Sequence, residues 1–133
     1  MKSYLAVFIG GALGSLCRYA INMSAGSAWF PWPTFIENAS GSLLLGLLTG
    51  FFSSRAKKPL IQLCLGTGFC GGYTTMSAFS KETALILQSA ALHNGVLYLA
   101  ASLASGICLA FIGIVLGNRI GGQAGQKKER YTS

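Results

Sequence analysis

The stretch GTGFCGGYTTMSAFSKE (residues 66–82) holds the strongest helix-breaking signal of a chain that is otherwise largely apolar. Glycines occupy positions 66, 68, 71 and 72, hydroxyl side chains follow them, and apolar residues flank the stretch on both sides. Broken backbone is tolerated at bilayer depth only where its freed amides and carbonyls find other partners within the protein. We therefore expect one membrane segment over residues 60–90, interrupted at the glycines and made of two half-helices.

Three other apolar runs, at residues 3–22, 33–53 and 95–117, are each long enough for one transmembrane helix, which needs about 20 residues. Only 10% of the 133 residues are charged and 52% are hydrophobic, whereas a soluble domain carries roughly 25% charged residues. The sequence thus predicts an all-α membrane protein with four transmembrane segments, the third one broken near its middle. Residues 1–120 are expected to form one transmembrane domain, followed by a flexible basic cytoplasmic tail over residues 121–133.

The basic residues indicate how the chain is oriented. They gather at Lys2, in the loop at 54–58 and in the tail, whereas the loops at 23–32 and 91–94 contain neither lysine nor arginine. The positive-inside rule then places both termini in the cytoplasm, as in a multi-pass protein of the inner (plasma) membrane. We attribute the net charge of +7 to this topology and expect no nucleic-acid partner.

Small residues recur at helical spacing in three of the predicted spans. They are Gly10 and Gly14 in the first, Ser42, Gly46 and Gly50 in the second, and Gly113 and Gly117 in the fourth. Such stripes let helices approach closely in lipid. Because four short spans bury little surface, we expect a compact bundle that dimerises.

Polar side chains inside the spans are candidates for function, because they are costly in lipid. Arg18 either snorkels or pairs with backbone carbonyls, or it makes the entrance of an anion path electropositive. Asn38 either forms an interhelical hydrogen bond or offers its amide NH2 group to a passing anion. Glu37 fits an anion path poorly: it faces the entrance or the lipid headgroups, pairs with Arg18, or marks a cation- or proton-coupled protein.

Hydroxyl groups on one face of the fourth span either bond back to their own helix or line a pore; they belong to Tyr98, Ser102 and Ser105. Phe79 either packs in the core or turns its ring edge, which carries partial positive charge, toward an anion. Backbone carbonyls near Gly71 and Thr74 could coordinate a small cation. The chain has no aspartate, no nucleophile–base pair and no metal-ligating cluster, so we do not expect an enzyme. Neutral donors and an aromatic edge suit a pore for a small anion that accepts hydrogen bonds.

Three motifs carry a resemblance to the Fluc/CrcB family of fluoride channels, which extends over residues 3–117. They are GGALGSLCRY (10–19), NASGSLLLG (38–46) and GFCGGYTTMSAFSKE (68–82). The resemblance implies an antiparallel, dual-topology homodimer in the lipid bilayer, with two fluoride pores and a structural sodium ion at the interface. Cytoplasmic fluoride would leave passively through these pores.

The resemblance also implies roles for individual residues. The pore would be lined by Asn38, Met76, Ser77, Phe79, Ser80, Tyr98 and Ser102. Carbonyls of Gly71 and Thr74 would hold the sodium ion, while Arg18 and Glu82 match charged positions of the family. The chain departs from the family at Met76, where a phenylalanine is usual, and at Glu37, where an apolar residue is usual. The strong basic bias would also suit a subunit of fixed orientation that pairs with an inverted homologue.

Two other classes compete with a fluoride channel. A proton-coupled exporter of the small multidrug type would need a membrane-embedded carboxylate, and only Glu37 or Glu82 could serve. A non-transporting scaffold would need only the small-residue contacts, with Gly46 and Gly113 at a dimer interface.

Overall fold

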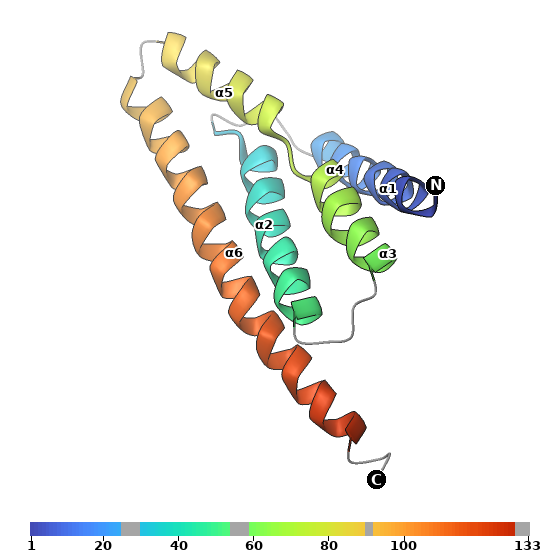
Figure 1. The fold of residues 1–133 in the computed structure, drawn as a ribbon. Helices are drawn as coiled ribbons and strands as arrows, with labels where there is room; N and C mark the ends of the chain where they lie inside the picture. Colours follow the sequence, from blue (N-terminus) through green and yellow to red (C-terminus); the bar gives the residue numbers. More distant parts are fainter. Residues whose placement is uncertain (25–29, 54–58, 90–91, 130–133) are drawn as a thin grey trace.

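The computed structural model describes residues 1–24, 30–53, 59–89 and 92–129, the last seven of these by their backbone alone. This part of the chain is helical (Figure 1), with elements α1 Lys2–Ser24, α2 Trp32–Ser53, α3 Pro59–Gln62, η1 Leu63–Cys70, α4 Gly71–Tyr73, α5 Met76–Gln88 and α6 Leu92–Glu129. Three helices are long and apolar enough to cross a membrane: α1, α2 and α6 as far as Gly122. The expected all-α membrane fold with four segments is confirmed at this level.

The third segment runs as one continuous helix from α3 through the π-helical η1 to the end of α4, and α5 follows after a short gap. The prediction of a break near the middle of the segment is confirmed, but the prediction that the glycines make the break was wrong. Gly71 is helical (φ −66°, ψ −34°), whereas Thr74 (ψ 154°) and Thr75 (φ −142°, ψ 117°) are extended. Glycine permits a break but does not impose one. Two adjacent β-branched residues suit extended backbone, and there the chain leaves the helix.

The glycines serve instead to bring helices into contact. A Cβ atom on Gly10 or Gly14 of α1 would collide with the backbone of η1, at Cys64 O and Phe69 O. Gly72 of α4 meets the carbonyl of Gly11 in the same way. The predicted small-residue stripe of α1 is thus confirmed as a contact surface, and its partner is the glycine-rich segment itself.

A second pair of helices forms by the same means. α2 and α6 lie side by side (Figure 1), and a Cβ on Gly46 or Gly50 would collide with α6 at Ala110 O or Ile114 O. Gly113 of α6 meets the carbonyl of Leu43 in return. The scaffold hypothesis placed Gly46 and Gly113 at a dimer interface, which is wrong, because they join two helices of one chain.

The two helix pairs, α1 with α3–η1–α4 and α2 with α6, are bridged by α5, which packs against α6. The α6 helix continues through Glu129, beyond the predicted domain boundary at 120. The basic loop at 54–58 and residues 130–133 lie outside the described residues. Large apolar side chains are exposed along α1 and α6, as lipid or another subunit would require.

Candidate functional site

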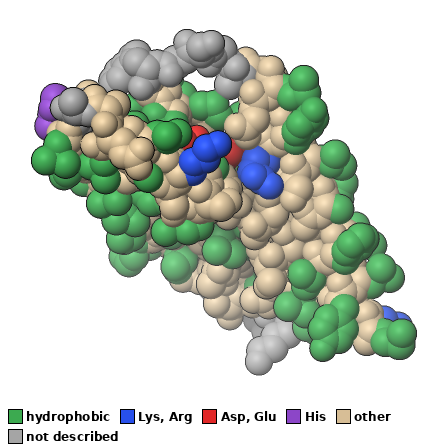
Figure 2. All heavy atoms as spheres, turned by 90° about the horizontal axis from the view of Figure 1, so that it is seen from above, with side chains coloured by type: hydrophobic (Ala, Val, Ile, Leu, Met, Phe, Trp, Pro, Cys, Tyr) green, Lys and Arg blue, Asp and Glu red, His purple; other side chains and the backbone are tan. Residues whose placement is uncertain are grey.

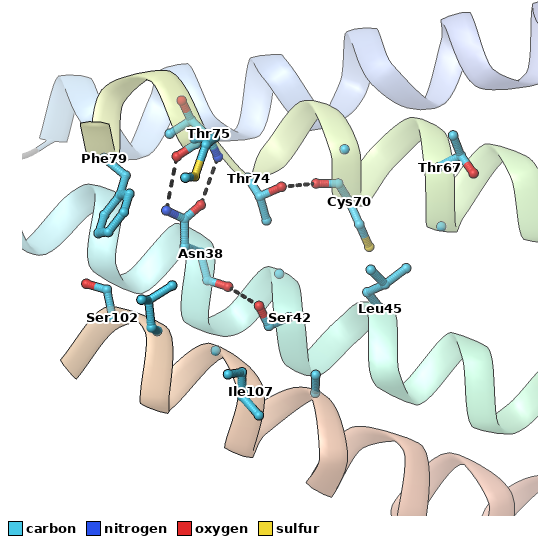
Figure 3. Close-up of a pocket in the computed structure, with 17 residues that line it drawn as sticks. Asn38, Ser42, Leu45, Thr67, Cys70, Thr74, Thr75, Phe79, Ser102 and Ile107 are labelled. Atoms are coloured by element: carbon cyan, nitrogen blue, oxygen red, sulfur yellow. Dashed lines mark hydrogen bonds between the residues drawn. The ribbon is translucent and has the colours of Figure 1, made fainter. Parts of the chain in front are cut away.

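An open groove of about 720 Å³ lies between the two helix pairs and ends at the break in the third segment (Figure 3). Its walls come from α2, η1, α4, α5 and α6, and they include Asn38, Ser42, Leu45, Thr67, Cys70, Gly71, Thr74, Thr75, Met76, Phe79, Ser102 and Ile107. None of the described residues that line it is charged. The groove is therefore largely apolar, with a few neutral polar groups in its walls.

Asn38 of α2 pairs with the broken backbone through both ends of its amide. Its Oδ1 accepts the Thr75 amide at 2.8 Å, and its Nδ2 donates to the Thr75 carbonyl at 3.1 Å (Figure 3). This pairing mimics a backbone partner and satisfies both polar groups of the extended residue. The interhelical hydrogen bond considered for Asn38 is thus confirmed. Since an amide NH2 has two protons and one is used here, the second is left for the groove.

The Thr75 hydroxyl begins the next helix. It accepts the amide of Ala78 at 3.2 Å, as an N-cap residue does, and it lies 3.2 Å from the Ser77 hydroxyl. Sequence reasoning did not single out Thr75, although a threonine ahead of a helical segment is a standard N-cap signal. Thr75 and Asn38 together define the start of α5.

The carbonyls before the break find different partners. Cys70 O accepts both the amide (2.9 Å) and the hydroxyl (2.8 Å) of Thr74. Gly72 O accepts Arg18 Nε at 3.2 Å and Ser15 Oγ at 3.4 Å. Gly71 O loses its normal helical partner, because the Thr75 amide bonds to Asn38 instead. Gly71 itself is among the residues that line the groove.

Aromatic packing places Phe79 at the end of the groove. The ring is 6% exposed, lines the groove, and lies 5.4 Å from the ring centre of Tyr98, which is 1% exposed. Core packing of Phe79 is therefore confirmed, and its ring also lines the groove, whereas the role of its ring edge toward an anion stays a prediction. Of the three hydroxyls on α6, Ser105 bonds back to Ser102 O at 3.1 Å. Ser102 is among the residues that line the groove, while its hydroxyl oxygen is buried, lies close to Tyr98, and is without a hydrogen bond of good geometry among the described residues.

The other predicted pore residues divide into two groups. Met76 lines the groove beside Thr75 and is 70% exposed, the position expected of a pore-lining residue. Ser77 and Ser80 are exposed on α5, and neither they nor Tyr98 are among the residues lining the groove. The structure therefore brings together Asn38, Met76, Phe79 and Ser102 but not the whole predicted set.

Glu82 is not among the residues that line the groove, but it is joined to the groove wall through Tyr98, which packs against Phe79. Its Oε1 accepts the Thr34 hydroxyl at 2.7 Å, and its Oε2 accepts the Tyr98 hydroxyl at 2.8 Å. Thr34 is buried, and sequence reasoning missed it because nothing local distinguishes this threonine from others in α2. Both carboxylate oxygens of Glu82 are thus fixed by neutral donors.

Arg18 and Glu37 lie near each other where α1, α2 and α4 meet. Arg18 bonds to the Gly72 carbonyl, which confirms the carbonyl-pairing alternative for this residue. Glu37 is 0% exposed, so the headgroup-facing position considered for it is wrong. Its Oε1 accepts Asn22 Nδ2 at 2.7 Å, and Arg18 is one helical turn from Asn22. Figure 2 shows acidic side chains between basic ones on the face seen from above.

A metal site built from side chains is not found: within the described ranges, no group of three or more His, Cys, Asp or Glu residues comes together. A cation at this site would need backbone oxygens. Gly71 and the extended Thr74 both belong to the groove wall. A Cβ on Gly71 would meet no atom within 4 Å, so this residue faces open space.

These features define a helical membrane protein with a broken third segment and an uncharged groove at the break. Comparison with known proteins gives the family. The chain belongs to the CrcB family, since the model described as "CrcB-like protein, Camphor Resistance (CrcB)" matches residues 5–114. The resemblance to the Fluc/CrcB family is thus confirmed.

Relatives with curated names agree with this membership. The chain is 77% identical to the "Fluoride-specific ion channel FluC 2" of Bacillus licheniformis over 100% of both chains. It is 58% identical to the protein of the same name from Bacillus subtilis, over 92% of both chains. It is 42% identical to the "Fluoride-specific ion channel FluC" of Rhodopseudomonas palustris, over 86% of this chain and 95% of that protein.

Proposed function

We propose that the protein is a fluoride-selective ion channel through which cytoplasmic fluoride leaves by passive electrodiffusion. The observation that carries the proposal is the groove at the helix break, where Asn38, Ser102 and Phe79 meet without a charged neighbour on the groove wall. The names of the relatives, which align with this chain over 92–100% of their own length, support the same activity.

The chemistry of the groove suits a small anion that accepts strong hydrogen bonds. The second proton of the Asn38 amide and the Ser102 hydroxyl are donors without a fixed partner, and a bound anion would supply the acceptor. The edge of the Phe79 ring carries partial positive charge. Neutral donors hold an anion less tightly than a lysine or arginine would, so that it can leave again.

The remaining pore positions belong to the ends of this path. Ser77 and Ser80, exposed on α5, would donate to the anion where it enters or leaves, and Met76 would form a polarizable wall. Tyr98 would act by holding the Phe79 ring and Glu82 in place. Arg18, bonded to the Gly72 carbonyl, would contribute positive charge near the entrance.

A second copy of the chain would close the groove. The groove is open, and its apolar wall residues Leu103 and Ile107 are exposed in the single chain. An antiparallel homodimer in the bilayer would cover them and produce two pores, one from each groove. An inverted homologue could take the place of the second copy, which the basic loop and tail residues favour.

A structural sodium ion fits the backbone at the break. The Thr75 amide, the usual helical partner of the Gly71 carbonyl, bonds to Asn38 instead, and Gly71 and the extended Thr74 both line the groove, which supports a site of backbone oxygens. Carbonyls from two subunits would supply the several oxygen ligands that a hard cation needs. The ion would add positive charge near the pore.

The competing classes explain less of the site. In a proton-coupled exporter, a carboxylate must be reachable from the groove, but Glu37 and Glu82 do not line it. In a scaffold, the open groove and the bonds between Asn38 and Thr75 would have no purpose. A channel uses both the open groove and the bonds between Asn38 and Thr75. We propose that the protein is such a channel and not an enzyme, and that it lies in the inner membrane of the cell.

The experiment is fluoride efflux from liposomes that contain only this chain, followed with a fluoride electrode. The proposal predicts rapid release from vesicles with protein and none from protein-free vesicles. No release from a monodisperse, helical preparation would overturn it. Release only after a homologue is added would retain the channel but replace the homodimer with the paired form.

A further inference from the structure

We propose that Glu37 is a proton-binding site that keeps the charge beside the anion path balanced. The proposal concerns a residue that departs from the family and that takes no part in the groove. It rests on the geometry of one partly buried cluster, in which Asn22 of α1 donates to the buried Glu37 of α2, and the charges of Arg18 on α1 and Glu82 on α5 act on Glu37.

Two carboxylates in this cluster face one cation. Arg18 and Asn22 are one turn apart on α1, and Asn22 donates to Glu37 Oε1 at 2.7 Å. Thr34 and Glu37 are neighbours on one face of α2, and Thr34 donates to Glu82 Oε1 at 2.7 Å. If both carboxylates were ionised, Arg18 alone would oppose them inside the protein, because Lys81 is exposed on α5, and a buried carboxylate without its own cation is costly in a membrane protein.

The hydrogen bonds show which carboxylate holds the proton. Both oxygens of Glu82 accept a bond from a neutral hydroxyl, Thr34 on one side and Tyr98 on the other, which is the pattern of an ionised group. Glu37 is 0% exposed and has one donor, Asn22, while its Oε2 is buried without a partner among the described residues. A buried charged oxygen without a donor costs far more than a neutral carboxylic acid there.

The groups that face Glu37 are therefore assigned as follows. Arg18 on α1 and Glu82 on α5 both act on Glu37, with opposite signs, and Glu37 itself carries no charge when it is protonated. From α6, Tyr98 reaches the cluster only through Glu82. From α4, the Tyr73 hydroxyl lies 3.0 Å from Ser40 Oγ, one turn farther along α2. Lys81 is exposed on α5 next to Glu82.

Loss of the proton would disturb the anion path, because Glu82 connects the cluster to the Phe79–Tyr98 pair at the end of the groove. One extra negative charge on the order of 10 Å from the path changes the rate of anion passage roughly tenfold at an effective dielectric constant of about 20. This consequence rests on the proposed channel activity. The presence of a proton on Glu37 does not depend on the proposed channel activity, and it can be measured separately.

The primary test is infrared spectroscopy of the full chain, in liposomes, between about pH 5 and about pH 8. The chain has only three acidic residues, so that the carbonyl band of a protonated, buried carboxylic acid can be assigned by substitution. The band is expected in the wild type, absent in Glu37→Gln, and unchanged in the control Glu129→Gln, which alters the end of α6. A wild type without the band, or a band that survives in Glu37→Gln, would overturn the proposal.

A second variant covers the case in which Glu37→Gln does not fold. Asn22→Ser changes the one hydrogen bond that the Glu37 carboxyl receives, so the frequency of the band should shift. An unshifted band would show that another group carries the proton and would also overturn the proposal.

The flux measurement then tests the consequence. Fluoride efflux, corrected for protein-free vesicles at the same pH, should rise roughly tenfold as the pH falls and the surplus charge is neutralised. In Glu37→Gln it should be high and independent of pH. A wild type with the infrared band but no efflux would contradict the channel and leave the proton site standing. Efflux whose pH dependence is the same in both proteins would contradict the coupling.

Discussion

Asn38→Asp tests how the groove selects for an anion, because it changes charge and hydrogen bonding with almost no change in size. The carboxylate that replaces the side-chain amide still accepts the Thr75 amide, which lies 2.8 Å from Oδ1 in the wild type. The second carboxylate oxygen, however, faces the Thr75 carbonyl, to which the amide nitrogen of Asn38 donates at 3.1 Å. An attractive contact becomes a repulsive one.

Two effects add to the barrier for fluoride. An unsatisfied buried acceptor costs about 1–3 kcal/mol, most of which strains the start of α5. A negative charge about 4 Å from a passing anion costs about 4 kcal/mol at an effective dielectric constant of about 20. Since about 1.4 kcal/mol corresponds to a tenfold change in rate, we expect efflux to fall on the order of a thousandfold.

The assay is initial fluoride efflux at equal protein density, with monodispersity and helical content checked for each variant. Ser42→Ala is the matched control, since Ser42 lines the same groove but its hydroxyl bonds back to Asn38 O at 2.7 Å. Its efflux should remain within about threefold of the wild type, since this change affects stability by only about 1 kcal/mol. Efflux of a folded Asn38→Asp protein close to the wild-type rate would remove Asn38 from the path.

Three further substitutions test the packing around the site. Gly46→Val should destabilise the α2–α6 pair by about 1–3 kcal/mol in a thermal melt, because its Cβ meets a carbonyl of α6. The control Gly122→Val should not destabilise the protein, because a Cβ there meets nothing within 4 Å. Equal melting temperatures of the two variants would contradict the contact. Thr34→Val should lower the stability of the protein by about 1–3 kcal/mol, because it removes the 2.7 Å hydrogen bond to the Glu82 carboxylate on α5. The control is Thr49→Val, at an exposed threonine whose hydroxyl bonds only to its own helix. An equal loss of stability in the two variants would refute the reasoning. Met76→Phe should raise fluoride efflux severalfold, because a ring edge replaces a thioether at a 70% exposed position of the groove; lower efflux from a folded variant would show that the thioether suits the path better.

The helices and their order could be predicted from the sequence because they depend on composition and on spacing within one segment. The runs at 3–22 and 33–53 agree closely with α1 and α2, and the small-residue stripes do lie at helix contacts. The position of the break could not be predicted in this way. Gly71 remains helical, and the chain is extended at Thr74 and Thr75, where Asn38, 37 residues away from Thr75, supplies the missing backbone partner.

The candidate site was likewise predictable in its polar residues but not in their pairings. Asn38, Phe79 and Ser102 were recognisable as unusual at membrane depth, and all three line the groove. The bonds from Thr34 to Glu82 and from Asn22 to Glu37 join residues 48 and 15 positions apart. Such partners depend on how α1, α2 and α5 pack, which no local pattern encodes.

The central claim is selectivity for fluoride, and the most direct test is to measure fluoride and chloride efflux from the same liposomes, each loaded with both salts and containing this chain alone. The account predicts that fluoride leaves rapidly, while chloride, which is larger and accepts weaker hydrogen bonds, is released hardly faster than from protein-free vesicles. Comparable release of the two anions would contradict the account, as would retention of both by a well-folded protein.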